Sequence, residues 1–284
     1  EIKSGDPSRR SEAEADIAVL ELDSWQLQGF GDLEISPNIS IFTNLLPDHQ
    51  NYYRNMDEYF ADKANIFKFQ TKGDSLFVGR GVLERVQESN PPVTAVVPPA
   101  IPAEWKLKIP GEHNRENASF AVSALRALGI DESEIRNGIE SFEGVEGRLQ
   151  FIGEAHGIKI YNDNNATTPE ATIAGLRALN VPGKRIILIM GGSDKGLDMS
   201  LLIKEISASC KKVLLLSGTG TSRIEKDLKD ASVFENLESA FESAIKYAEA
   251  GDTILFSPAF ASFGIFRNEY ERNDQFVKLV KKYL

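Results

Sequence analysis

The sequence predicts an α/β protein whose second half is a doubly wound parallel sheet. Four continuous apolar runs predict strands there, at residues 158–161, 185–190, 212–217 and 253–257. Helical apolar spacing separates and follows them, at residues 169–179, 199–209, 223–228, 237–248 and 274–283. The strand-like runs are largely continuous apolar stretches rather than alternating ones. Strands that are buried on both faces and separated by helices are typical of a parallel sheet.

The first half follows the same alternation less regularly. Short apolar runs predict strands at residues 17–22, 39–44, 75–78 and 93–97, and helical spacing predicts helices at 57–69, 114–128 and 133–142. Gly129 directly follows the second of these helices, as helix ends favour. One helix ends and a new strand begins near residues 144–147. We therefore predict two domains, 1–144 and 145–284.

Composition excludes several classes of protein. The 284 residues carry 42 acidic and 32 basic side chains, a net charge of −10, which argues against a nucleic-acid partner because phosphate binding needs basic surfaces. One cysteine, Cys210, rules out an intramolecular disulfide framework and suits a reducing compartment. No apolar run approaches the ~20 residues that span a membrane. The first residues show neither a signal sequence nor a methionine, so we expect an internal start.

Polar residues follow the predicted strands, where an open parallel sheet binds its ligands. Glu21 ends the first run, Asp48 and His49 follow the second, and polar stretches occupy 163–168, 191–196 and 257–259. Glu, Asp and His at strand ends would suit Mg²⁺, which takes oxygen ligands. Gly191-Gly192 ahead of Lys195 resembles a phosphate-binding turn, although the spacing is not that of a nucleotide P-loop.

Ordinary structural roles remain open for each of these residues. Glu21 could be a solvated strand end, and His49 could cap the next helix. Lys63 could be a surface lysine whose stem lies along apolar neighbours. Arg148 could form a salt bridge at the domain boundary. The polar stretch before Pro169 could be a helix cap, with the proline in the first turn.

Six segments, in order, resemble the Mur ligase family over almost the whole chain. They are Val19-Leu-Glu-Leu-Asp-Ser-Trp-Gln-Leu27, Asn44-Leu-Leu-Pro-Asp-His49 with Tyr59-Phe-Ala-Asp-Lys-Ala-Asn-Ile-Phe67, Gly111-Glu-His-Asn-Arg-Glu-Asn117, Gly147-Arg148, residues 162–169, and Leu255-Phe-Ser-Pro-Ala-Phe-Ala-Ser-Phe263 with Arg267-Asn268 and Glu271-Arg272. Within the family, the Asn-Asp-x-x-Ala-Thr-x-Pro stretch resembles the branch that adds D-glutamate to UDP-N-acetylmuramoyl-L-alanine. The resemblance implies the remainder of a Mur-type central ATPase domain followed by a Rossmann-like C-terminal domain.

The resemblance also implies a reaction. ATP phosphorylates a substrate carboxylate, and the amine of an amino acid attacks the acyl phosphate to form an amide. This step belongs to peptidoglycan precursor synthesis in the cytoplasm, and so to cell-wall biogenesis, cell shape and cell division. The implied enzyme is an ATP-dependent acid–amino-acid ligase that uses Mg²⁺ and acts as a monomer without nucleic-acid or membrane partners.

Residue roles follow from the same resemblance. Glu21, His49 and Lys63, the last as its carbamate, would hold Mg²⁺. Asn114 and Asn117 would lie near the nucleotide, with Arg148 and Asp163 on its phosphate and ribose. The amino acid would be held by residues that follow strands in the second domain: Asn165, Thr167, Lys195, Ser262 and Phe263. The expected catalytic set is His49, Lys63, Arg148 and Lys195.

Departures from the family pattern concern mainly the amino acid. Asn165 stands where a lysine is usual, Gly147 replaces a histidine, Gly264 an aspartate, and Glu269 a common aromatic residue. The family's Gly-Lys loop and UDP-binding domain are absent from these 284 residues, so we expect this chain alone to be inactive. Two alternatives stay open: another Mur or folylpolyglutamate-type ligase, and a non-catalytic binding module derived from a ligase.

Overall fold

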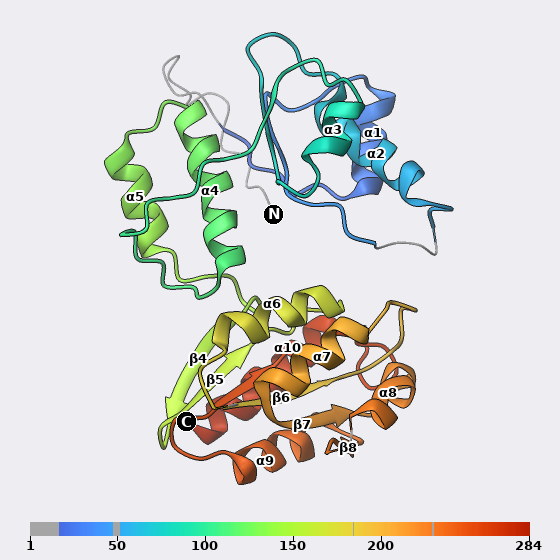
Figure 1. Cartoon of the computed structure of the whole chain (residues 1–284), viewed down its shortest axis with the longest axis vertical. Helices are drawn as coiled ribbons and strands as arrows, with labels where there is room; N and C mark the ends of the chain where they lie inside the picture. Colours follow the sequence, from blue (N-terminus) through green and yellow to red (C-terminus); the bar gives the residue numbers. More distant parts are fainter. Residues whose placement is uncertain (1–16, 48–51, 184, 229) are drawn as a thin grey trace, which may run out of the picture. The chain divides into compact units, whose positions relative to one another are not determined.

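The computed structural model describes residues 17–47, 52–183, 185–228 and 230–284. It divides into two compact units, Glu1–Pro98 and Pro99–Leu284 (Figure 1). Helices and parallel strands build both units, which confirms the α/β class. The predicted division at 144/145 falls instead between two elements of the second unit, and it stays a prediction about family domains.

The first unit holds a parallel sheet in the order β1-β2-β3. Its elements are α1 (Ser24–Asp32), β1 (Ile39–Phe42), α2 (Met56–Lys68), β2 (Ser75–Val78), α3 (Leu83–Glu88) and β3 (Ala95–Val96). Phe42, Phe60, Phe67 and Leu76 form its core. Helix α2 begins where the Asn55 side chain accepts hydrogen bonds from the next turn, as an N-cap residue does.

The strand predicted at residues 17–22 is wrong. These residues form no helix or strand, and the side chain of Val19 is 92% exposed. Helix α1, which the apolar pattern missed, begins directly afterwards. Its signal is a capping box, in which Asp23 accepts from the Gln26 N–H and Gln26 accepts from the Asp23 N–H, each at 2.8 Å. An apolar run becomes a strand only where another strand pairs with it.

The second unit begins with two helices, α4 (Glu112–Ala127) and α5 (Glu132–Ser141), both close to their predicted bounds. A six-stranded sheet follows, in the order β4-β5-β9-β6-β7-β8. Its strands are β4 (Gln150–Ala155), β5 (Ile158–Asn162), β6 (Ile186–Gly191), β7 (Cys210–Leu216), β8 (Ser232–Phe234) and β9 (Thr253–Phe256). Strand β4 pairs antiparallel to β5, and every other pairing is parallel.

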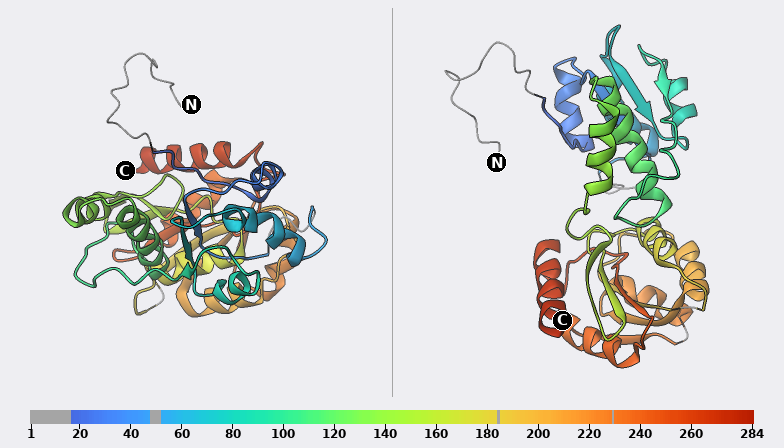
Figure 2. Two further views of the ribbon diagram at one scale, coloured as in Figure 1. Left: turned by 90° about the horizontal axis from the view of Figure 1, so that it is seen from above. Right: turned by 90° about the vertical axis from the view of Figure 1, so that its left-hand side faces the viewer.

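Helices cover both faces of this sheet (Figure 2). Ile186, Leu188 and Met190 point to a core shared with α6 (Pro169–Leu179) and α7 (Ser200–Ser209). Ile187 and Ile189 point to the opposite core, shared with α9 (Leu237–Tyr247) and α10 (Glu269–Tyr283). The short α8 (Thr219–Ile224) and the 3₁₀ turn η2 (Glu225–Asp227) complete the unit.

This arrangement confirms the doubly wound sheet. Each of the four predicted strands of the second half is present, and α6 has its predicted bounds. Alternate side chains of one strand enter two different cores, which explains why apolar residues follow one another along the central strands. None of the helices in the described part of the chain is long and apolar enough to cross a membrane.

Candidate functional site

Loops that follow β5, β6 and β9 meet at the carboxyl-terminal end of the strands in the six-stranded sheet. Gly191 donates its N–H to the Pro258 carbonyl at 2.9 Å, and Ser193 donates to the Ala261 carbonyl at 3.0 Å. At Gly192 the φ angle is +144°, and an added Cβ would lie 2.3 Å from the Ala261 carbonyl oxygen. The glycines therefore serve close packing of two loops. The N–H groups of Gly191 and Ser193 are thus occupied by backbone carbonyls, and a phosphate-binding role for this turn stays a prediction.

Asp163 lies among these loops, directly after β5, and its side chain is 7% exposed. Its Oδ1 accepts the Leu149 N–H at 3.0 Å, and its Oδ2 accepts the Ser257 hydroxyl at 2.8 Å. Burial raises the pKa of the Asp163 carboxyl to about 6, although the hydrogen bonds and the charge of Arg148 lower it. An added Cβ on Gly175 of α6 would lie 2.9 Å from Oδ2, so only glycine lets the helix pack against this carboxylate.

Arg272 of α10 lies beneath the same loops with no exposed surface. Its guanidinium donates to the Asn164 side chain at 2.8 Å, the Asn164 carbonyl at 2.9 Å and the Phe260 carbonyl at 3.2 Å. Asn164 in turn donates to the Glu269 carbonyl at 3.1 Å. Burial lowers the pKa of Arg272 to about 10. This residue ties together the loop after β5, the loop after β9 and the start of α10.

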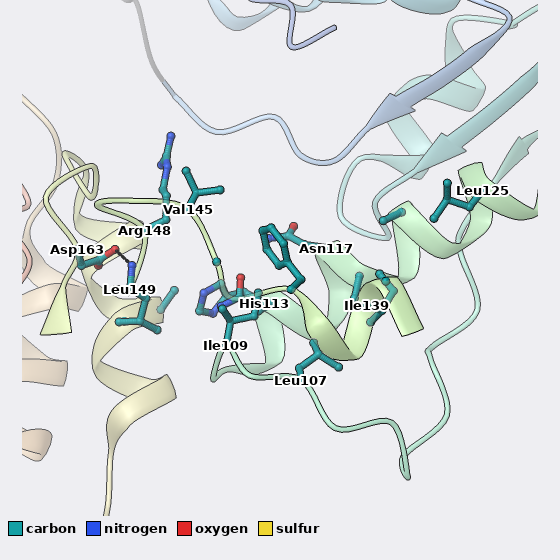
Figure 3. A pocket seen from close by; sticks show the side chains of 18 of the residues that line it. Leu107, Ile109, His113, Asn117, Leu125, Ile139, Val145, Arg148, Leu149 and Asp163 are labelled. Carbon is teal, nitrogen blue, oxygen red and sulfur yellow. Dashed lines mark hydrogen bonds between the residues drawn. The ribbon is translucent and has the colours of Figure 1, made fainter. Parts of the chain in front are cut away.

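A cavity of about 800 Å³ lies between α4, α5 and α6 (Figure 3). All four residues that we expected near the nucleotide line it, namely Asn114, Asn117, Arg148 and Asp163. Most of the other lining side chains are apolar, among them Leu107, Ile109, Leu125, Ile135, Ile139, Val145 and Leu149. A large apolar cavity with a few polar groups at one end is typical of a small-molecule site.

His113, which the sequence analysis did not select, also lines this cavity. Burial lowers the pKa of its imidazole, so the neutral ring is favoured. An added Cβ at Gly111 would lie 2.7 Å from that ring, and Gly111 has a φ of +104°. His113 directly precedes Asn114, which is one of the residues expected near the nucleotide. That adjacency was the sequence signal that could have identified His113.

A second cavity, of about 400 Å³, opens at the same end of the sheet. The five residues expected to hold the amino acid all line it, together with Arg148: Asn165, Thr167, Lys195, Ser262 and Phe263. Lys195 Nζ donates to Thr167 Oγ1 at 3.2 Å. Ser262 is 4% exposed, whereas Phe263 is 62% exposed.

Two residues of α10 complete this second cavity. Glu269 had been noted only as a departure, and Tyr270, 73% exposed, had been missed. The departing residues Gly147 and Asn165 are neighbours, since the Asn165 N–H donates to the Gly147 carbonyl at 2.9 Å. An added Cβ at Gly147 would lie 3.2 Å from the Asn165 side chain.

The structure describes only two of the three expected metal ligands, Glu21 and Lys63. Glu21 is exposed and precedes α1, and Lys63 on α2 is half-buried with its Nζ 5.2 Å from the centre of the Tyr59 ring. His49 lies outside the described residues. Within the described ranges, no group of three or more His, Cys, Asp or Glu side chains could hold a metal ion. A carbamate on Lys63 would add oxygen ligands, and the magnesium site stays a prediction.

Comparisons with known proteins point to one family. The family model described as the Mur ligase middle domain matches residues 8–90, and the one described as the Mur ligase glutamate ligase domain matches residues 147–260. UDP-N-acetylmuramoylalanine–D-glutamate ligases are similar over most of the chain. The Roseiflexus sp. enzyme is 32% identical across 93% of this chain and 65% of its own length. The Borreliella burgdorferi enzyme is 33% identical across 92% and 63%.

Solved structures share the fold. MurC from Thermotoga maritima superposes with a TM-score of 0.65 at 20% identity, over 92% of this chain and 62% of its own. MurF from the same organism, in complex with ADP, superposes with a TM-score of 0.66 at 15% identity, over 93% of this chain and 66% of its own. FolC from E. coli, in complex with DHPP and ADP, superposes with a TM-score of 0.64 at 16% identity, over 88% of this chain and 63% of its own. The chain thus spans just under two thirds of the length of the curated relatives named here.

Proposed function

This chain belongs to the Mur ligase family, and we propose that it serves the ATP-dependent ligation of D-glutamate to UDP-N-acetylmuramoyl-L-alanine. The observation that carries the proposal is the position of Arg148, which lines both cavities. The larger cavity would bind the nucleotide and the smaller one the amino acid. A cation common to both would then lie near the phosphoryl group and near the amino acid whose amine attacks the acyl phosphate.

Each group in the cavities can be given a task. ATP would supply the phosphoryl group that activates the substrate carboxylate, with Mg²⁺ held by Glu21, His49 and carbamylated Lys63. Arg148 would stabilise the charge that develops during that transfer. Asn114 and Asn117 would contact the adenine end, where the cavity is otherwise apolar. These steps follow the reaction that the family resemblance implies, and the names of the relatives support its ligase class.

The smaller cavity would orient the attacking amine. It contains two cations, Arg148 and Lys195, and one carboxylate, Glu269. An amino dicarboxylate carries the complementary charges, two negative and one positive. Thr167, Ser262 and Asn165 would add hydrogen bonds. The ammonium would first lose a proton, and the free amine would attack the acyl carbon. The nitrogen would lose a second proton as the bond to phosphate breaks and the amide forms.

A panel of amino acids tests the proposal on the full-length gene product. Phosphate release from ATP is followed with UDP-N-acetylmuramoyl-L-alanine and, in turn, D-glutamate, L-glutamate, L-lysine and meso-diaminopimelate. We expect release that depends on D-glutamate. Release with another amino acid, or with a folate acceptor, would keep the ligase class and reassign the substrate. A folded protein that releases no phosphate with any pair would instead support the binding-module alternative.

The 284-residue chain alone is expected to give no release. It contains no Gly-x-x-x-x-Gly-Lys-Ser/Thr sequence, and the backbone N–H groups of that loop hold the β- and γ-phosphates. The same assay, run on the 284 residues beside the full-length product, checks this expectation. Activity of the shorter chain would contradict it. The reaction would take place in the cytoplasm, and we expect a monomer.

A further inference from the structure

Lys195 lies on a segment without regular structure. Residues 194–199, which follow β6, form neither helix nor strand, and Gly196 has a left-handed φ of +74°. A lysine side chain is long and flexible, and fixing it costs conformational entropy. A lysine that binds a carboxylate in the smaller cavity therefore binds it more tightly when other contacts hold its backbone in place.

The first restraint on this segment is the loop after β9. Strand β6 lies between β9 and β7 in the sheet, so the loop after it has neighbours on both sides. On the β9 side, Ser193 exchanges two backbone hydrogen bonds with Ala261, at 3.0 and 3.2 Å, and its hydroxyl donates to the Phe263 carbonyl. These bonds fix the chain as far as Ser193, two residues before Lys195.

The second restraint is helix α8, which follows β7 (Figure 1). Nη2 of Arg223 forms an ion pair with Oδ1 of Asp194 at 3.0 Å. The same nitrogen donates to the Leu197 carbonyl at 2.6 Å. One guanidinium nitrogen thus joins the residue before Lys195 to the second residue after it, and it anchors both to α8.

We propose that Arg223 is a positioning residue, which acts through Asp194 to hold Lys195 Nζ at the smaller cavity. At the other end of the lysine, Nζ donates to Thr167 Oγ1 at 3.2 Å, on the loop after β5. Arg223 itself lines neither of the two cavities, so its effect on the amino acid would pass through Lys195. The inference rests on the proposed amino-acid site and adds to it a residue that no motif had selected.

Steady-state kinetics of the full-length product test the role of Arg223. Phosphate release is followed at varied D-glutamate and at varied ATP for wild type and Arg223→Met. The KM for D-glutamate should rise about fivefold while kcat and the KM for ATP stay within about twofold, because only the contact of Lys195 with a carboxylate is disturbed. Arg223→Lys, which keeps a cation near Asp194, should return the KM for D-glutamate to within about twofold of wild type. Equal increases in both KM values would overturn the inference.

A double-mutant cycle tests whether Arg223 acts through Lys195. In a Lys195→Met background, Arg223→Met should raise the KM for D-glutamate by less than about twofold further. A further increase of about fivefold would overturn the inference, since Arg223 would then act by another route. Arg177→Met is the matched control, because Arg177 pairs with Glu205 at 2.8 Å in the same unit and lines neither cavity. It should change neither KM.

Amide exchange in the 284-residue chain separates this inference from the proposed function. The Asp194 N–H donates to Thr219 Oγ1, and the Gly196 N–H donates to Asp194 Oδ1, each at 3.0 Å. Without any ligand, both should exchange at least about threefold faster in Arg223→Met, while the Ser193 N–H, bonded to the loop after β9, keeps its wild-type rate. Unchanged rates at residues 194 and 196 would overturn the inference. A full-length product that releases no phosphate with any amino acid would overturn the proposed function, and these rates would still decide whether Arg223 holds the segment.

Discussion

Asp163 shows how the environment changes the chemistry of one side chain. As an exposed residue it would be fully ionised at neutral pH, but burial raises the pKa of its carboxyl to about 6. The folded state therefore binds a proton more tightly than the unfolded state between the ordinary pKa of 3.8 and about 6. Its contribution to stability is present below the lower value and is lost as pH rises through the higher one.

Substitution by asparagine should remove this dependence. We expect the free energy of unfolding of wild type, relative to Asp163→Asn, to fall on the order of 3 kcal/mol between pH 4 and pH 7. Urea unfolding at several pH values measures it. Asp198→Asn is the control, because hydrogen bonds from Ser200 lower the pKa of Asp198 and the sign of the effect should reverse. A constant difference between wild type and Asp163→Asn would contradict the prediction.

Lys195 carries the second residue-scale prediction. Its ammonium lies in the smaller cavity beside Thr167. In the full-length product, Lys195→Met should raise the KM for the amino acid by about tenfold or more while the KM for ATP changes little, since one charged contact to a carboxylate is lost. Steady-state phosphate release measures both constants. Lys204→Met, on the exposed surface of α7, should change neither. Equal increases in both KM values would remove Lys195 from the amino-acid site.

At the scale of elements, helix α1 contains a matched pair of glycines. An added Cβ at Gly29 would meet no atom within 4 Å, whereas at Gly31 it would lie 2.5 Å from Nδ2 of Asn65. Asn65 is buried on α2 and its Nδ2 donates to the Leu27 carbonyl at 3.0 Å, so it cannot easily move. The contact between the two helices therefore depends on Gly31 and not on Gly29.

Alanine substitutions should have opposite signs in this pair. Gly29→Ala should stabilise the protein by up to about 1 kcal/mol, because alanine loses less backbone entropy in a helix. Gly31→Ala should destabilise it by about 1–3 kcal/mol through overpacking against Asn65. Urea unfolding followed by circular dichroism measures both. Two substitutions of the same sign would show that α1 does not pack on α2 in this way.

Ion pairs connect the amino-terminal ends of several strands of the six-stranded sheet. Asp252, 1% exposed, lies just before β9 and binds Lys211 of β7 at 2.7 Å and Arg185, just before β6, at 3.4 Å. The Lys211 hydrogen bond and the two charges lower the pKa of Asp252 in spite of its burial. The amino ends of three strands are thus joined by charge, at the edge opposite the loops that line the smaller cavity.

For the whole molecule, both cavities lie within the unit Pro99–Leu284. If the larger one binds the nucleotide, ADP should slow amide exchange in α4, α6 and residues 147–149 of the 284-residue chain. Exchange in β1 and β2 of the other unit should stay the same. Hydrogen exchange read by mass spectrometry measures both regions, with Arg148→Ala as the variant that should lose the protection. Equal protection of both units would contradict this assignment.

Several features could be predicted from the sequence because their cause is local. The strands β5, β6, β7 and β9 are mostly apolar, and α6 is marked by the Thr168 cap and Pro169. The segments that resemble the family selected nine residues that the structure places around two cavities. Their positions could be foreseen from motifs, and their roles remain predictions.

Other features depended on contacts that no local pattern contains. Residues 17–22 read as a strand but pair with no strand in the described part of the chain. The short edge strand β8 was not predicted, because an edge strand needs only one apolar face. Nothing in the sequence marks Asp163 as buried between Leu149 and Ser257, or Arg272 as enclosed beneath the loops. The sequence by itself determined which segments are apolar, and so which segments could form strands. Only the tertiary structure decided which polar groups meet, because burial and hydrogen bonding between distant residues exist only after the chain has packed.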